Sequence, residues 1–252
     1  MISPHVHVPI EKIGAHLELI LSHKLNLEIY ISAAQSDSLP DEGLQRVRDL
    51  LTHSPSLSLH APFMDLSPGA VDDGVRHVTM DRFRKALAHA SLLGAGVVVF
   101  HSGFEKWKYA PKPEWWLEKS LLTWEPLIRE AEQLGIRIAI ENIFEDGPSN
   151  LRMLMDRLGG VHFGICFDTG HCNLFSRVPL EEWMESLNPH IIELHLHDND
   201  RTADQHLPVG DGTFDFQRFF SLLRNLDAIP TLEAHSPERV IRSLKNLSNY
   251  IK

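Results

Sequence analysis

The chain alternates short apolar runs with longer segments of helical periodicity from its first residues to its last. Runs such as SLSLH, VVVFH and IRIAIE have the length and composition of buried β-strands. The predicted strands cover residues 4–8, 25–31, 56–60, 96–101, 136–141, 163–168, 191–197 and 230–234. The predicted helices cover residues 11–23, 41–53, 75–94, 113–134, 149–158, 179–187, 215–226 and 237–250.

Eight strands in strict alternation with eight helices predict one α/β fold. Parallel strands need helical crossovers, and eight of them close a sheet into a barrel. Residues favoured at helix starts support the helix boundaries at Pro113, Ser149, Pro179, Asp215 and Ser236-Pro237. Glycines stand at expected helix C-caps at Gly94, Gly135 and Gly160. Because no linker or low-complexity tract interrupts the alternation, we expect residues 1–252 to form a single (β/α)8 TIM barrel.

Strand periodicity places polar residues inside this barrel. In the run IRIAIE, Glu141 shares a face with Ala139, whereas the isoleucines point the other way, toward the helices. By the same alternation Glu193, His195 and His197 point inward on the seventh strand. The active sites of such barrels lie at the carboxyl-terminal ends of the strands. The last residues of each strand are therefore the candidates for chemistry.

Nine residues of metal-binding type stand at or just after strand ends. They are His60, His101, Glu141, Asp168, His171, His195, Asp204, His206 and Glu233. A single histidine in such a place is usually a hydrogen-bonded core residue. Burying several carboxylates without cations would cost several kcal/mol each, so nine such residues together predict a metal cluster.

Composition limits the classes of protein that fit. The chain is 43% hydrophobic and has no apolar run of membrane-spanning length, so we expect a cytoplasmic protein without membrane contact. Its two cysteines, Cys166 and Cys172, are too few for a disulfide framework, and Cys166 is expected as an apolar filler below the rim. The net charge of −10 disfavours nucleic acid as a partner, although a local basic groove would still permit it.

Several motifs together resemble one known superfamily. LEIYI, LSLHAPF, VVVFHSG, IAIEN, CFDTGH, LHLHDND, DQHLPVGDGTFDF and TLEAH span nearly the whole chain. The most specific are the D-x-x-H of Asp168 and His171 and the H-x-H-D that is followed by D-x-H and a Gly-rich turn. The chain thereby resembles the xylose isomerase-like TIM barrels. That superfamily contains sugar isomerases and epimerases as well as endonuclease IV-type apurinic/apyrimidinic endonucleases.

The resemblance implies particular metal ligands. In the isomerases one cation is held by the residues that match Glu141, Asp168, His195 and Glu233. In the endonucleases, residues matching His60 and His101 hold a second metal together with the bridging Glu141. Residues matching His171, Asp204 and His206 hold a third. His197 departs from the endonuclease pattern, which usually has an amide there. One to three divalent cations per chain are thus implied, with zinc suited to the His-rich positions and manganese to the central site.

Three functions remain open at this point. The preferred one is a metal-dependent isomerase or epimerase of a small sugar or sugar phosphate, with Glu141, Glu233 and His171 as candidate catalytic residues. The main alternative is a zinc-dependent phosphodiesterase acting on abasic DNA, in which His60 and His101 become essential. The third is a barrel that binds sugar as a sensor. Neither the substrate nor homo-oligomer formation follows from the sequence.

Candidate substrate-binding residues lie in the loops that follow the strands. Phe63 follows the third strand, and Trp107 stands among aromatic residues and lysines after the fourth, in a loop that is either a sugar-covering lid or simply packed on the rim. His197 ends the predicted seventh strand, and Arg201 follows it, placed to reach a carboxylate or phosphate. Glu28 faces inward on the second strand and is expected to meet substrate or to pair inside the barrel. The Gly-rich turn at 208–212 is expected to fix the preceding Asp204 and His206.

Overall fold

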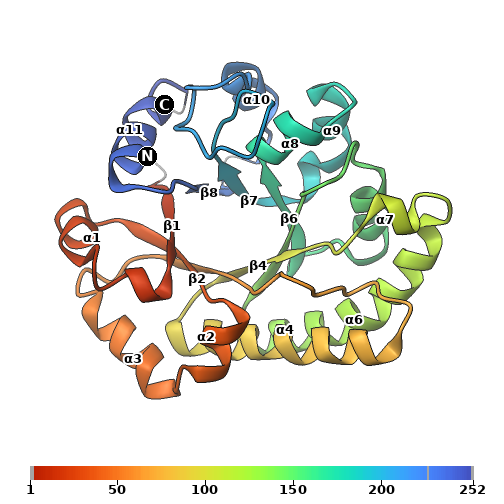
Figure 1. Cartoon of the computed structure of the whole chain (residues 1–252), viewed down its shortest axis with the longest axis horizontal. Coiled ribbons are helices and arrows are strands. Elements are labelled where there is room, and N and C mark those ends of the chain that lie inside the picture. Colours follow the sequence, from red (N-terminus) through yellow and green to blue (C-terminus); the bar gives the residue numbers. More distant parts are fainter. Residues whose placement is uncertain (1–2, 226, 251–252) are drawn as a thin grey trace.

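A computed structural model describes residues 3–225 and 227–250 of the chain and shows a closed eight-stranded parallel barrel (Figure 1). The strands are hydrogen-bonded in sequence order, and β1 closes the ring by pairing with β8. They are β1 (His5–Pro9), β2 (Asn26–Tyr30), β3 (Leu57–His60), β4 (Val97–His101), β5 (Arg137–Glu141), β6 (Phe163–Asp168), β7 (Ile191–Leu196) and β8 (Ile229–Leu232). The predicted (β/α)8 TIM barrel is confirmed.

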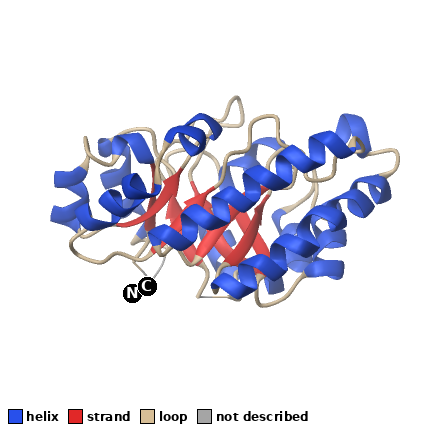
Figure 2. Cartoon of the chain, turned by 90° about the horizontal axis from the view of Figure 1, so that it is seen from below, coloured by secondary structure: helices blue, strands red, loops and turns tan. Residues whose placement is uncertain are grey.

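Helices surround the strands (Figure 2). The crossover helices are α1 (Leu17–His23), α3 (Asp41–Leu50), α4 (Asp73–Leu93), α6 (Pro113–Leu134), α7 (Ser149–Leu158), α9 (Leu180–Leu187), α10 (Phe216–Leu222) and α11 (Pro237–Leu247). Short helices within the loops are α2 (Ala33–Ser38), α5 (Lys106–Tyr109) and α8 (Thr169–Phe175), and the 3-10 turns are η1 (Ile10–Lys12) and η2 (Asn188–His190). In the described part of the chain, no helix combines the length and apolar character needed to cross a membrane.

Several helix boundaries differ from the sequence prediction; α3 ends at Leu50 rather than at residue 53, and α11 ends at Leu247 rather than at residue 250. The helix expected over 11–23 is divided into η1 and the short α1, because Gly14 lies in the middle of the segment and weakens a continuous helix. Gly94 and Gly135 are left-handed C-caps as expected, but α7 ends at Gly159 rather than Gly160. Leu226, the last residue of the helix predicted over 215–226, lies outside the described residues.

The strands separate two environments, as the predicted alternation requires. Large side chains such as Trp124 and Phe100 fill the space between the strands and the helices. Inside the barrel, Ala139 and Cys166 pack in a small apolar layer with Val97 and Val99. Small interior side chains leave room above them for polar groups. This apolar layer therefore lies directly below the polar residues at the carboxyl-terminal ends of the strands.

Candidate metal centre

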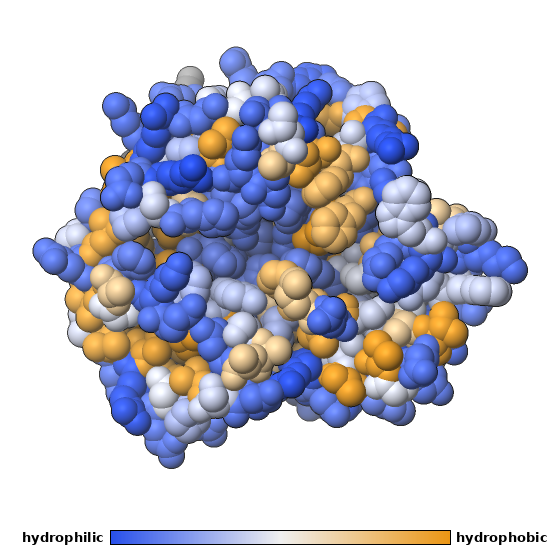
Figure 3. Space-filling model, viewed as in Figure 1, coloured by the Kyte–Doolittle hydropathy of each residue, from blue (hydrophilic) through white to orange (hydrophobic). Residues whose placement is uncertain are grey.

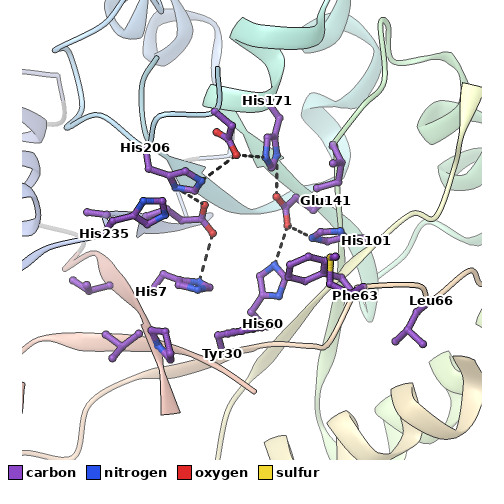
Figure 4. Close-up of a pocket in the computed structure, with 18 of the residues that line it drawn as sticks. His7, Tyr30, His60, Phe63, Leu66, His101, Glu141, His171, His206 and His235 are labelled. Atoms are coloured by element: carbon purple, nitrogen blue, oxygen red, sulfur yellow. Dashed lines mark hydrogen bonds and ion pairs between the residues drawn. The ribbon is translucent and has the colours of Figure 1, made fainter. Parts of the chain in front are cut away.

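The nine predicted ligands form one connected cluster at the carboxyl-terminal ends of the strands. Figure 4 shows several of them around the pocket, among them His60, His101, Glu141, His171 and His206. Glu141, the last residue of β5, lies at its centre. Its Oε2 is 3.2 Å from His60 Nε2 and 3.4 Å from His101 Nε2. Its Oε1 is 3.1 Å from His171 Nδ1 and 3.5 Å from His195 Nδ1. A carboxylate with imidazoles at both oxygens has the arrangement of a bridging metal ligand.

His195 Nδ1 lies among the other members of the predicted central site. It is 3.2 Å from Glu233 Oε1, 3.5 Å from Glu141 Oε1 and 3.8 Å from Asp168 Oδ2. The nitrogen is buried, and no hydrogen bond satisfies it within the described residues. A buried nitrogen without a partner is unfavourable, whereas a divalent cation accepts mixed imidazole and carboxylate ligands. The four side chains therefore fit such a cation.

Asp204 organises a second part of the cluster, on the loop after β7. Its Oδ2 lies 3.1 Å from His206 Nε2 and 3.5 Å from His171 Nε2. His206 has a φ of 45°, in the left-handed region that few residues other than glycine adopt. The guanidinium of Arg239 donates a hydrogen bond to the His206 carbonyl oxygen at 3.1 Å and helps hold this backbone. Such strained residues concentrate at functional sites.

The acidic and imidazole groups shift one another's pKa values. Burial raises the pKa of Glu141, but His195, His101 and His171 together, with His195 contributing most, hold that pKa well below its ordinary range. Burial also opposes the lowering of the Glu233 pKa, which the charges of His195, His7 and His206 together bring to about 2. Burial lowers the pKa of His171, but the Asp168 carboxylate contributes to raising it well above its usual value. The surrounding imidazoles thus keep Glu141 and Glu233 ionised, and these two carboxylates favour a positive charge between them.

Glu28 fixes the ring of His195. It is fully buried on β2, and its Oε2 lies 3.1 Å from His195 Nε2. Its Oε1 lies 2.7 Å from Nδ1 of His7, on the neighbouring β1. Because Nε2 of His195 is held by Glu28, Nδ1 faces the other carboxylates. This is the usual way in which an outer carboxylate orients a metal-binding histidine.

Asn142 and the start of α8 fix Asp168 and His171. The Asn142 side chain accepts a hydrogen bond from the Asp168 backbone N–H at 2.9 Å and donates one to the Asp168 carbonyl at 3.0 Å. Asp168 is the N-cap of α8, and its Oδ1 accepts a hydrogen bond from the His171 backbone N–H at 2.6 Å. The sequence DTGH therefore places a carboxylate and an imidazole side by side through one helix start.

His197 supports the cluster from one side. Its ring is fully buried, and its Nε2 lies 3.0 Å from Asp168 Oδ2. The ring stacks on that of His206 at a centroid distance of 4.0 Å and an interplanar angle of 5°. A cation bound by a ring nitrogen lies close to the plane of that ring, so two parallel stacked rings cannot both bind the same ion well. In this geometry His197 is positioned to orient Asp168.

The cluster opens into a cavity of about 860 Å³. This volume is within the range of small-molecule sites, about 300–1,000 Å³. Figure 3 shows a hollow in this face of the molecule with hydrophilic side chains inside it and hydrophobic side chains along part of its edge. Residues of the cluster that line the cavity are His60, His101, Glu141, His171, Asp204, His206 and Glu233. Asp168 and His195 are fully buried beside them.

A model of the xylose isomerase-like TIM barrel family matches residues 24–250. The chain belongs to this family. Protein TTHB071 from Thermus thermophilus, solved after soaking with ZnCl2, is 30% identical over 98% of this chain and 97% of its own, with a TM-score of 0.81. A D-tagatose 3-epimerase-like protein is 26% identical over 98% of this chain and 96% of its own, with a TM-score of 0.84. The uncharacterized protein MJ1311 of Methanocaldococcus jannaschii is 28% identical and covers 83% of this chain and 74% of its own.

In this xylose isomerase-like barrel, the four predicted substrate-binding residues occupy different places. Phe63 lines the cavity and stacks on His101 at a centroid distance of 4.3 Å. Trp107 is 87% exposed on α5 and is not part of the cavity wall. The exposed Arg201 is also outside the wall, and its Nε donates to Asn173 Oδ1 at 3.0 Å. His197 contacts the cluster but does not line the cavity.

Sequence reasoning missed two histidines of the xylose isomerase-like barrel. His7 lines the cavity, and its Nδ1 lies 3.5 Å from Glu233 Oε1 as well as close to Glu28. His235 also lines the cavity and stacks on His206 at a centroid distance of 4.4 Å. The alternation in HVHV could have identified His7 as an inward-facing residue near the end of β1. For His235, which stands in a loop beyond β8, strand alternation offers no such signal.

Proposed function

We propose that the protein is a divalent-metal-dependent isomerase or epimerase that acts on a small sugar or sugar phosphate. The observation that carries this proposal is the approach of two carboxylates to the same nitrogen of one buried imidazole. His195 Nδ1 lies 3.5 Å from Glu141 Oε1 and 3.2 Å from Glu233 Oε1. Glu141 ends β5 and Glu233 directly follows β8, and these two strands are three apart in the ring. A substrate bound here has a carboxylate on each of two sides.

The central group fits one cation held by Glu141, Asp168, His195 and Glu233. A bound divalent cation supplies positive charge that polarises a carbonyl and makes a proton on the adjacent carbon more acidic. Manganese suits the oxygen-rich central position, and zinc suits the positions with more imidazoles. We propose one cation for the isomerase reaction and up to three where the whole cluster is filled.

The two glutamates would carry out the proton transfer. Both have lowered pKa values, which burial opposes and neighbouring imidazoles cause, so both are ionised and able to accept a proton. One carboxylate removes the proton from the carbon beside the carbonyl. The protonated glutamate returns it to the adjacent carbon in an isomerisation, or the other glutamate, protonated from solvent, delivers a proton to the opposite face in an epimerisation.

His171 is the candidate to interact with a substrate oxygen. It lines the cavity, and its pKa is raised well above the ordinary value because nearby acidic groups outweigh the effect of burial. An imidazole that keeps its proton can donate a hydrogen bond to an oxygen on which negative charge develops. This role applies when only the central site is filled, since His171 would be a ligand in a filled cluster.

A phosphodiesterase acting on abasic DNA is the second candidate. The arrangement of His60 and His101 on one oxygen of Glu141 favours it, because a one-cation isomerase does not need these imidazoles. Clustered cations can generate hydroxide and stabilise the leaving oxygen of a phosphodiester. The net charge of −10 opposes the binding of a DNA backbone. We therefore place this function second and a non-enzymatic sugar sensor third.

The proposal is tested by deuterium exchange. Protein reconstituted with Mn²⁺ is incubated with a panel of ketoses in D2O, and deuterium at the carbon beside the carbonyl is followed by NMR. We expect exchange that is lost in Glu141→Gln and in Glu233→Gln and retained in Glu182→Gln, a control on the exposed side of α9. Metal content is measured for each variant. Incision of an abasic duplex that is lost in His101→Ala, without exchange on any ketose, would replace this function by the second candidate.

A further inference from the structure

The cavity has a second, apolar part that the metal centre does not explain. It is lined by side chains from the outer face of β1, from α1 and the start of β2, and from α11. These are Val6, Val8, Leu19, Ile20, Leu25 and Val240, which we call the β1 recess. Val6 and Val8 alternate with His5 and His7, whose rings face the barrel interior. The β1 recess therefore lies between the strand and the helices.

The helical layer is less closely packed between α1 and α11 than it is around α4 and α6. Among the described residues, α4 packs against α3 and α6, and α6 packs against α7, whereas α1 and α11 make no comparably close pairing. The cause is local, because the short α1 covers only Leu17–His23 and the preceding segment forms the turn η1. In Figure 1, β1 runs between α1 and α11. Folded cores rarely leave apolar space open, and such space stays dry and accepts apolar ligands.

The β1 recess is continuous with the metal centre. The same cavity is lined by His7, Glu233 and Ala234 on its way from the cluster to Val240. His7 Nδ1 lies 3.5 Å from Glu233 Oε1, at the edge where the polar and apolar parts meet. A molecule with two oxygens at the centre can therefore extend across the ends of β1 and β8 into the recess.

The cavity wall also offers few neutral polar partners. Among the described residues that line it, none is asparagine, glutamine, threonine or arginine. The side-chain hydroxyls come from Ser67, Ser102, Ser236 and Tyr30. A sugar hydroxyl placed against the β1 recess would lose its hydrogen bonds to water without replacement, which costs about 1–3 kcal/mol for each group. The β1 recess, which is formed by apolar side chains alone, therefore favours apolar surface over additional hydroxyls.

We infer that the substrate is a hydroxy-carbonyl compound whose polar head carries an apolar substituent, and that the β1 recess holds this substituent. Only the binding of the polar head at the metal centre rests on the proposed function; the binding of the apolar substituent in the β1 recess does not. The cluster at Glu141 and Glu233 would take the adjacent oxygens, and Ile20 and Val240 would contact the apolar part. A sugar derivative with an alkyl group has this chemistry, whereas a free sugar leaves the recess unused.

A series of alkyl hydroxamates tests the inference, because a hydroxamate presents two adjacent oxygens to a metal. Acetohydroxamate, hexanohydroxamate and octanohydroxamate are titrated calorimetrically into the Mn²⁺-loaded protein. Full burial of each added methylene is expected to strengthen binding roughly fourfold, so octanohydroxamate should bind at least about a hundredfold more tightly than acetohydroxamate. Leu19→Trp narrows the recess from its half-buried side and should remove most of this gain. Val161→Trp adds the same bulk at a position that is 81% exposed and should retain it.

Each outcome decides between the alternatives. Equal affinities along the series, or a gain that persists in Leu19→Trp, would overturn the β1 recess as the site of the substituent. Leu19→Phe, which adds less volume, replaces Leu19→Trp if the latter does not fold. Acetohydroxamate that binds the metal-loaded but not the metal-free protein supports the metal-bound head in either case. Octanohydroxamate that binds equally tightly with and without metal would support the recess but contradict the proposed function.

Discussion

Gly170 leaves the space that the ring of His197 occupies. A Cβ atom at position 170 would lie 2.0 Å from His197 Cε1 and 2.3 Å from its Nδ1. The ring cannot move away easily, because it is fully buried and stacked on His206, with Nε2 3.0 Å from Asp168 Oδ2. The glycine of the DTGH motif and the second histidine of the HLHD motif are therefore one packing unit.

Gly170→Ala is predicted to destabilise the protein by about 2–3 kcal/mol, the upper part of the range for overpacked cores. The reason is the clash with His197, since Gly170 lies in α8, where alanine is otherwise favourable. Urea unfolding monitored by circular dichroism measures the change. In a His197→Ala background the same Gly170→Ala substitution should cost much less stability than it does in the parent protein. An equal cost in both backgrounds would mean that the clash is not with this ring.

Glu193→Gln is predicted to remove a pH dependence of stability. Burial raises the pKa of Glu193 to about 8 from an ordinary value of 4.5. Between these values the folded protein holds a proton that the unfolded chain has released, so stability falls as the pH rises from about 4.5 through about 8. The amide cannot ionise, and Glu193→Gln should therefore be more stable than the parent protein at pH 8, by up to several kcal/mol.

Urea unfolding at pH 6, 7 and 8 checks this prediction. Ser58 and Thr231 donate to Oε1 of Glu193, and the amide oxygen of glutamine can accept the same hydrogen bonds. Glu182→Gln, at an exposed position on α9, is the control and should leave the pH dependence unchanged. If Glu193→Gln and the parent protein lose the same stability as the pH rises from 6 to 8, a group other than Glu193 must cause the pH dependence.

Metal affinity is predicted to increase with pH. His171 and His195 have pKa values well above the ordinary value, because acidic neighbours outweigh the effect of burial. In the metal-free protein these imidazoles hold protons, and a cation must displace the proton from each one that it binds. The affinity for Mn²⁺ should fall about tenfold per pH unit for every proton released, as the pH is lowered from 8 to 6. Calorimetric titration at three pH values measures it, and a flat profile would contradict the protonated state.

Glu28→Gln is predicted to weaken metal binding without unfolding the protein. Glu28 holds His195 through Nε2 and is not among the four groups of the central site. Loss of such an orienting carboxylate typically costs 10–100-fold in metal affinity. Glu145→Gln is the matched control, because Glu145 is also buried but pairs with Ser102 and Asn150 rather than with the cluster. Equal affinities in both variants would show that Glu28 does not position His195.

The sequence was sufficient to predict the barrel and the nine residues of the cluster. It was not sufficient to predict the contacts that hold their side chains in place. Strand alternation with a period of two placed Glu141 and His195 on the inner face, because the rule depends only on the backbone. The stacking of His197 on His206 depends on a loop whose left-handed residue has no local sequence signal. The β1 recess was also unpredicted, because it results from the interruption of a helical pattern at Gly14 and from the spacing of α1 and α11.

The anomalous difference density of a crystal soaked in Mn²⁺ tests the metal centre most directly. We predict one strong peak among Glu141, Asp168, His195 and Glu233, within coordination distance of all four side chains. Further peaks beside His60 and His101, or beside Asp204 and His206, would show that more of the cluster is filled. A crystal with no peak at the central four residues would contradict the account.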